Sequence, residues 1–195
     1  EKDAIRLHRA ISWLNCAENS ESNKDIQFIS LWIAFNACYA STVTIDSQTT
    51  ERIRFKEFIA KLIEFDSEQR FFHLLWNKFS GPVRLLLQKQ FLYKPFWDYQ
   101  QGFIPDWKVS FEKSLEHSMM LLSKNKVAEL LEIVLERLYM LRNQIMHGGA
   151  TYKSKINRVQ LRDSCNMLNL FVPLIIEIML IKHDEDWGDI NFPVI

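Results

Sequence analysis

The chain has 195 residues, a length at which one domain is expected and at which a hydrophobic core needs no disulfide or metal. Five glycines and five prolines are too few for a turn-rich sandwich or barrel, and the glycines cannot form a Walker loop or a G-x-G-x-x-G dinucleotide turn. The 24 basic and 24 acidic residues cancel to a net charge of zero, so any contact with nucleic acid must come from a local patch.

The cysteines and histidines point away from a disulfide framework and from a local metal site. The three cysteines are scattered and lack C-x-x-C spacing, which is typical of the reducing cytosol. No two of the five histidines stand at metal-ligand spacing, so the sequence predicts no locally encoded metal site and no cofactor. The most apolar stretches, residues 28–40 and 167–181, fall short of the ~18–20 residues of a membrane-spanning helix. We therefore expect a cytoplasmic protein without a membrane partner, and the first residue, Glu1, is typical of a trimmed chain or a fragment.

The apolar patterning predicts helices from the start of the chain. Apolar residues recur at helical spacing over residues 3–18, and residues 25–40 are apolar on nearly all sides, which indicates a buried central helix. Shorter helices are expected at about 51–65, 67–79 and 83–92. Residues 94–107 hold two prolines, a glycine and five aromatic residues, a composition that favours an ordered loop packed by its own rings.

Longer helices follow at about 107–123, 126–147 and 154–182. The second of them carries an apolar seam alternately four and three residues apart, formed by Val127, Leu131, Val134, Leu138, Leu141 and Ile145. Such a seam is expected inside a helical bundle or across a dimer. Gly148-Gly149 should end this helix with a left-handed cap, and the apolar residues of the tail, 183–195, should pack back on the body. The sequence thus predicts one all-α domain.

The most unusual local sequence is RNQIMHGG at residues 142–149, where four polar residues interrupt the apolar seam. Asn143 and His147 are four residues apart and therefore share a face of the helix. His147 lies at the negative end of the helix dipole, which favours a positive charge, and histidine is the side chain that exchanges a proton near neutral pH. From these residues alone, an acid–base site and a simple cap of the last helical carbonyls by His147 and Arg142 are equally good interpretations.

The spacing Arg142-Asn143-x-x-x-His147 resembles the R-x4-6-H motif of the HEPN superfamily, and ISWLNCAEN (11–19) and LWIAFNACYA (31–40) are similar to its Apea-like branch. The resemblance implies an up-and-down helical bundle with its core at about 1–40 and 107–182, and a helical insertion at about 45–105. It also implies a metal-independent endoribonuclease, such as a toxin or phage-defence effector. Arg142 and His147 would act on an RNA phosphodiester, and Asn143 would orient His147 or contact phosphate.

The residue types suit this chemistry. RNA brings its own nucleophile, the 2′-OH, so cleavage needs a base, an acid and positive charge on the phosphate. One histidine and one arginine cannot easily supply all three, whereas two copies in a homodimer can, and the resemblance implies a site at such an interface. It also implies an antitoxin or a nucleotidyltransferase-like protein as a partner.

A basic stretch follows the motif, with Lys153, Lys155, Arg158 and Arg162 before the first acid, Asp163. The last three of these four should share one face of the final helix, along which an RNA backbone could lie. A merely solvated helix face explains the same pattern equally well. The alternative to an enzyme is a non-catalytic HEPN-like dimerisation module that binds a partner protein, RNA or a nucleotide.

Overall fold

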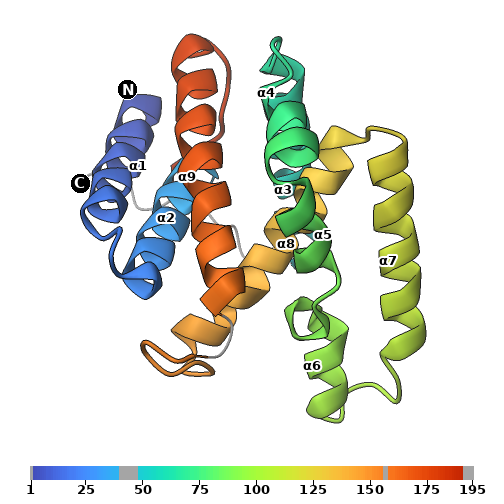
Figure 1. Ribbon diagram of the computed structural model, residues 1–195. Coiled ribbons are helices and arrows are strands. Elements are labelled where there is room, and N and C mark those ends of the chain that lie inside the picture. The colour runs from blue at the N-terminus through green and yellow to red at the C-terminus, as the bar shows by residue number, and fades with distance from the viewer. Residues whose placement is uncertain (1, 40–47, 156–157, 191–195) are drawn as a thin grey trace. The chain divides into compact units, whose positions relative to one another are not determined.

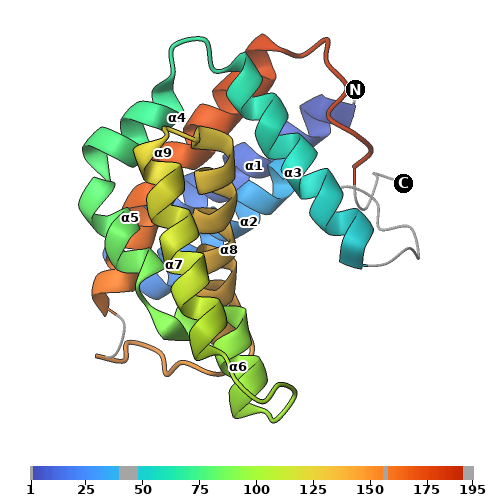
Figure 2. The same cartoon turned by 90° about the vertical axis from the view of Figure 1, so that its right-hand side faces the viewer.

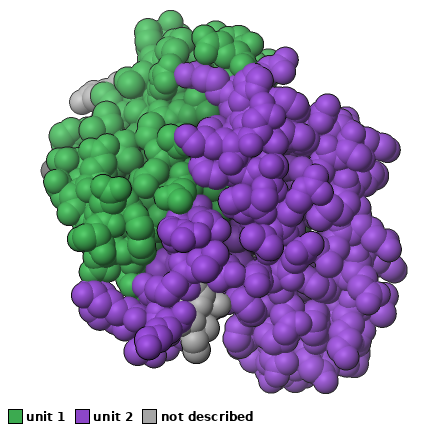
Figure 3. Space-filling view, in the orientation of Figure 1, with its two compact units in different colours: residues 1–68, 164–195 green, residues 69–163 purple. Residues whose placement is uncertain are grey.

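The structure, a computed structural model, describes residues 2–39, 48–155 and 158–190, and every regular element within these ranges is a helix (Figure 1). No strand occurs in them, so the prediction of an all-α chain is confirmed. The chain forms two compact units, a first unit of residues 1–68 and 164–195 and a second unit of residues 69–163 (Figure 3). These units cut across the predicted core and insertion, because each of them takes residues from both.

The first unit is built on a buried helix. Its helices are α1 (Lys2–Asn19), α2 (Lys24–Tyr39), α3 (Gln48–Phe65) and, from residue 164, α9 (Arg158–Ile181) (Figure 2). Helix α1 packs against α2. The side chains of Trp32 and Phe35 on α2 are 5% and 1% exposed, which confirms that the helix predicted at residues 25–40 is buried. An all-round apolar surface forces this burial, because no face of such a helix is stable in water.

Aromatic rings join α3 to the end of α2. The ring of Tyr39 lies 5.2 Å from that of Phe55 and 5.8 Å from that of Phe58, between ring centres. Pairs at these distances add to the free energy of burial by about 0.5–1.5 kcal/mol each. The described part of α3 therefore belongs to the same core as α2, although its sequence lies within the predicted insertion.

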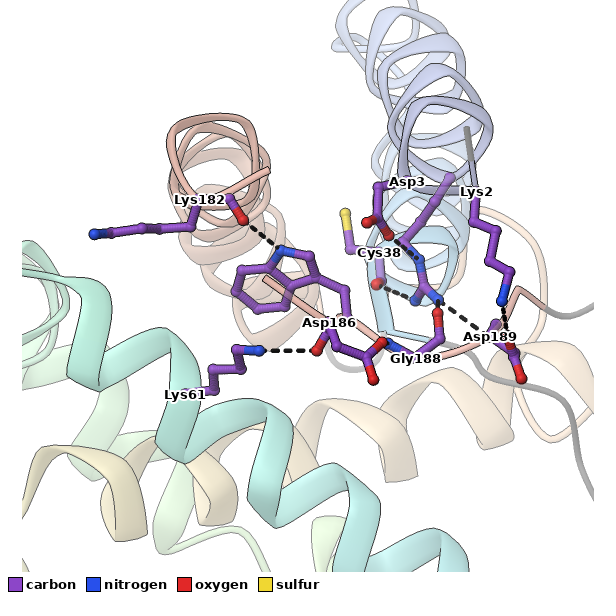
Figure 4. A network of polar contacts seen from close by, with 10 residues as sticks. Lys2, Asp3, Cys38, Lys61, Lys182, Asp186, Gly188 and Asp189 are labelled. Carbon is purple, nitrogen blue, oxygen red and sulfur yellow. Dashed lines mark hydrogen bonds and ion pairs between the residues drawn. The ribbon is translucent and has the colours of Figure 1, made fainter. Parts of the chain in front are cut away.

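The segment after α9 belongs to the first unit and packs against its helices, as the sequence predicts. Trp187 is buried, its ring centre lies 6.0 Å from that of Phe58, and its indole N–H donates to the carbonyl of Lys182 at 3.0 Å. The ammonium of Lys61 lies 4.9 Å from the centre of the Trp187 ring and donates to the carbonyl of Asp186 at 2.8 Å (Figure 4). The rest of the predicted tail, residues 191–195, lies outside the described residues.

A buried arginine ties this segment to two helices. The guanidinium of Arg6, on α1, donates to the carbonyl of Cys38 at 2.7 Å, near the end of α2, and to the carbonyls of Gly188 at 2.9 Å and Asp189 at 3.1 Å (Figure 4). Asp3 supplies a carboxylate 3.7 Å from the Arg6 Nε. Burial lowers the pKa of Arg6, because it disfavours the charged form. The hydrogen bonds to these carbonyls compensate that cost.

Alkylation should distinguish the three cysteines. Cys38 and Cys165 are buried, whereas Cys16 is only partly buried, and burial raises the pKa of the Cys38 thiol to about 12. The thiolate is the reactive form, so at pH 8 we expect iodoacetamide to modify Cys16 in the native chain, and Cys38 and Cys165 only after unfolding in urea. Peptide mass spectrometry with and without urea measures this difference. Modification of native Cys38 as fast as Cys16 would contradict the burial described above.

The second unit contains shorter elements and two long helices. They are α4 (Arg70–Phe72), the π-helix η1 (His73–Lys78), α5 (Ser80–Leu87), the 3₁₀ turn η2 (Gln90–Leu92), α6 (Lys94–Gln100), α7 (Lys108–Ser123) and α8 (Val127–Met146). Helix α8 packs against α5, η2 and α7. The indole N–H of Trp76, on η1, donates to the carbonyl of Leu122, on α7, at 2.9 Å.

The aromatic segment at residues 94–107 is packed by its own rings, as predicted, but it is not a loop throughout. The ring centre of Phe96 lies 5.2 Å from that of Trp97 and 5.1 Å from that of Trp107. The segment begins with helix α6, which corrects the prediction of a loop. Pro95 lies in the first turn of α6, where its missing N–H costs no hydrogen bond.

The apolar seam of α8 is covered by the chain itself. Leu131, Val134, Leu138 and Leu141 are all buried. Val127 and Ile145, at the two ends of the seam, are partly exposed, so a second copy cannot use the middle of the seam as its contact surface. Of the two interpretations of the seam, the structure supports a bundle interior.

Helix α9 begins at Arg158 and not at residue 154 as predicted, and residues 156 and 157 lie outside the described ones. Among the described helices, α9 is long and apolar enough to cross a membrane by length and composition. More than half of its most apolar window is buried inside the chain, as in the core helices of soluble proteins. The cytoplasmic location stays a prediction.

Candidate nucleic-acid site at the end of helix α8

His147 caps the C-terminal end of α8 and its side chain is exposed. Its backbone N–H donates to the carbonyl of Asn143 at 3.0 Å. Gly148 follows with φ +75°, so the left-handed turn predicted for the end of this helix is confirmed. The imidazole is thus held at the helix end by its backbone and remains open to solvent.

Gly149 is required for a different reason. A Cβ atom at this position would lie 3.0 Å from the carbonyl oxygen of Gln144, which is closer than side chains normally approach. The chain therefore turns back against the last turn of α8 directly after His147. The two adjacent glycines serve this turn, one through its positive φ and the other through its close approach to the helix.

Arg142 is held beside Asn143. Its Nη1 donates to the Asn143 Oδ1 at 2.9 Å, and its guanidinium carbon lies 5.9 Å from the ring centre of Tyr139, one turn earlier. The Asn143 amide oxygen therefore orients the guanidinium of Arg142. The Asn143 backbone carbonyl accepts from the His147 N–H, as in any helix, and that the Asn143 side chain orients His147 or contacts phosphate stays a prediction.

Gln144, in the middle of the motif, has a structural role. Its side-chain amide donates to the carbonyl of Phe91, which also accepts the indole N–H of Trp97 at 2.7 Å. These two donors fix the 3₁₀ turn η2 and helix α6 to the last turn of α8. Gln144 is therefore occupied by packing and does not belong to the chemistry of the site.

Sequence reasoning missed Arg137, which is buried on α8 and supports the same region. Its guanidinium donates to the carbonyl of Leu92 at 3.2 Å and to the Ser114 Oγ at 3.1 Å, and it lies 4.6 Å from the ring centre of Tyr93. Burial lowers the pKa of Arg137. The signal available in the sequence was a lone basic residue directly before Leu138 of the apolar seam.

The four basic residues after the motif fall into two groups. Lys153 and Lys155 are exposed and precede α9, so the prediction that Lys155 lies on the last helix is wrong. Arg158 and Arg162, four residues apart in the first turns of α9, do share a helical face. Arg162 forms an ion pair with Asp163 at 3.3 Å, which partly neutralises its charge.

Residues 142–155 therefore carry an exposed imidazole, a guanidinium and two exposed lysines, all within the second unit. In the part of the chain that the structure describes, no group of three or more His, Cys, Asp or Glu side chains could hold a metal ion. Such a set of donors and cations suits the binding of a phosphate diester and the transfer of a proton.

Comparisons with known proteins add no family to this description. No family model matches the chain, and neither a curated protein nor a solved structure shows a significant match.

Proposed function

We propose that the chain is a metal-independent endoribonuclease of the HEPN type that cleaves RNA by attack of the 2′-OH. The observation that carries the proposal is the exposed His147 at the end of α8, with Arg142 five residues earlier and held by Asn143. A toxin or phage-defence effector is the cellular role that the resemblance implies.

His147 is the group that moves protons. It takes the proton of the 2′-OH, whose oxygen attacks the neighbouring phosphorus, and the bond to the 5′-oxygen breaks. Arg142 stabilises the negative charge that builds up on the phosphate oxygens. The products are a 2′,3′-cyclic phosphate and a free 5′-hydroxyl.

The leaving 5′-oxygen also needs a proton, which a single chain does not readily supply. A second copy brings a second His147, so we propose that the active form is a homodimer in which two RNQIMH segments face one RNA. Because the α8 seam is buried, this dimer would form around the exposed end of α8. An antitoxin or a nucleotidyltransferase-like protein would be the partner that restrains the enzyme.

The test is incubation of the purified chain with cellular RNA in EDTA. We expect cleavage that EDTA does not inhibit, products that end in 2′,3′-cyclic phosphate, and no cleavage of a strand whose sugars are 2′-deoxy. Gel analysis and mass spectrometry of the product ends measure this. Inhibition by EDTA, or equal cutting of the 2′-deoxy strand, would rule out the proposed chemistry. RNA binding without any cleavage would instead favour the non-catalytic interaction module.

A further inference from the structure

Two exposed tyrosines precede and follow His147 in the sequence, and a basic side chain lies beside each of them. Tyr139 is 49% exposed, with the Arg142 guanidinium 5.9 Å from its ring centre. Tyr152 is 59% exposed, with the Lys153 ammonium 5.3 Å from its ring centre. One pair lies before the histidine in the chain and the other after it, and both belong to the second unit.

The turn that carries the Tyr152–Lys153 pair has a lysine at a position where the backbone conformation favours glycine. The N–H of Ser154 donates to the carbonyl of Thr151 at 2.9 Å, and Lys153, the third residue of this turn, has φ +56°. That position strongly favours glycine or asparagine, because a left-handed φ strains other residues. A turn that only connected two helices would gain by carrying glycine. Lysine is nevertheless found there, which leaves a long basic side chain directly beside Tyr152.

The charged residues along this stretch of the sequence are all basic. No acidic residue occurs between Glu136 and Asp163, whereas this stretch carries Arg142, Lys153, Lys155 and Arg158, besides the buried Arg137 and Arg162, which is paired with Asp163. In a chain of zero net charge, this is a local concentration of positive charge. It complements a phosphate backbone.

We propose that the Tyr139–Arg142 and Tyr152–Lys153 pairs are two base-stacking subsites, which hold the unpaired nucleotides on either side of the phosphate that His147 acts on. This inference rests on the proposed function. Each exposed ring offers a face for one base, and the cation beside it attracts the adjoining phosphate. Tyr139 precedes His147 by eight residues, roughly 12 Å along the helix axis, which leaves room for a nucleotide between them.

The proposal commits to single-stranded RNA as the ligand. Bases in a duplex are already paired and stacked, and side chains cannot reach their faces in an A-form helix. The subsites should therefore select unpaired segments, and they should do so without a strong preference for sequence, because every base has a face that stacks.

Binding measurements on catalytically inactive protein test the subsites separately from cleavage. In a His147→Ala background, fluorescence anisotropy would follow a labelled single-stranded oligoribonucleotide and the same strand in a perfect duplex. We expect Tyr139→Ala and Tyr152→Ala each to weaken single-strand binding about 5- to 140-fold, the equivalent of ~1–3 kcal/mol for one stacked base. Tyr139→Phe and Tyr152→Phe should bind as the parent does, because the ring is retained.

Tyr99, on α6 of the same unit and 43% exposed, is the matched control. Tyr99→Ala should leave binding unchanged, and Lys153→Gly should weaken binding without lowering the melting temperature, because it relieves the strained φ. Unchanged binding in both tyrosine-to-alanine variants, equal loss in Tyr99→Ala, or equal affinity for duplex and single strand would overturn the subsites. If the two tyrosines contribute to binding but the wild-type chain does not cleave RNA, the stacking subsites are supported and only the proposed ribonuclease activity is refuted.

Discussion

Replacing His147 with alanine is expected to lower the rate of RNA cleavage about 10²- to 10⁴-fold, the usual cost of removing one acid–base group. The fold should survive, because the His147 side chain is exposed and the hydrogen bond that holds this residue comes from its backbone N–H. A surface substitution of this kind changes the free energy of unfolding by about 0.5 kcal/mol or less. The cleavage rate and the melting temperature should be measured on the same preparation. A large loss of rate at an unchanged melting temperature would indicate a catalytic role for His147 and not only a role in capping the helix.

His117 provides the control for this experiment, because it is an exposed histidine on α7 of the same unit. His117→Ala should cleave at the wild-type rate. Arg142→Ala should weaken both RNA binding and turnover, since it would remove charge stabilisation and not the proton transfer itself. Full activity in the His147→Ala variant would contradict the catalytic role of His147, and capping the end of α8 would then be its only function.

Replacing Arg6 with methionine is expected to lower the free energy of unfolding by about 3–5 kcal/mol and the melting temperature by ~6–20 °C. Methionine keeps an unbranched apolar chain in the same space but removes every hydrogen-bond donor. The carbonyls of Cys38, Gly188 and Asp189 then lose a charged donor inside the first unit. The bond to Cys38 is buried and the other two are partly buried, and a fully buried acceptor left without a partner costs about 1–3 kcal/mol. Thermal unfolding followed by circular dichroism measures the loss.

The ion pair between Lys2 and Asp189 is the comparison within the same network (Figure 4). Both side chains are mostly exposed, so water and salt screen their attraction. Lys2→Ala should therefore leave the melting temperature nearly unchanged. If Arg6→Met also melted at the wild-type temperature, the Arg6 hydrogen bonds would not be what anchors the segment after α9.

The sequence by itself determined the parts of this protein that depend on local pattern. Helix-period spacing predicted an all-α chain, and the all-round apolar surface of residues 25–40 predicted that α2 is buried. The motif at residues 142–149 correctly located the end of α8, because Gly148 has to adopt a positive φ there. Each of these features is decided by residues within a few turns of one another, and sequence spacing reports such short-range effects directly.

Only the tertiary structure decided which side chains are committed to packing. Arg6 donates to Gly188, 182 residues away, and Gln144, which lies inside the motif, donates to Phe91, 53 residues away. Helix α6 forms where the composition suggested a loop, and the α8 seam, compatible with a dimer, is buried within the chain. The physical reason is that a hydrogen-bond donor satisfies any acceptor that the fold brings within reach. Local spacing carries no record of which distant carbonyl or ring that will be.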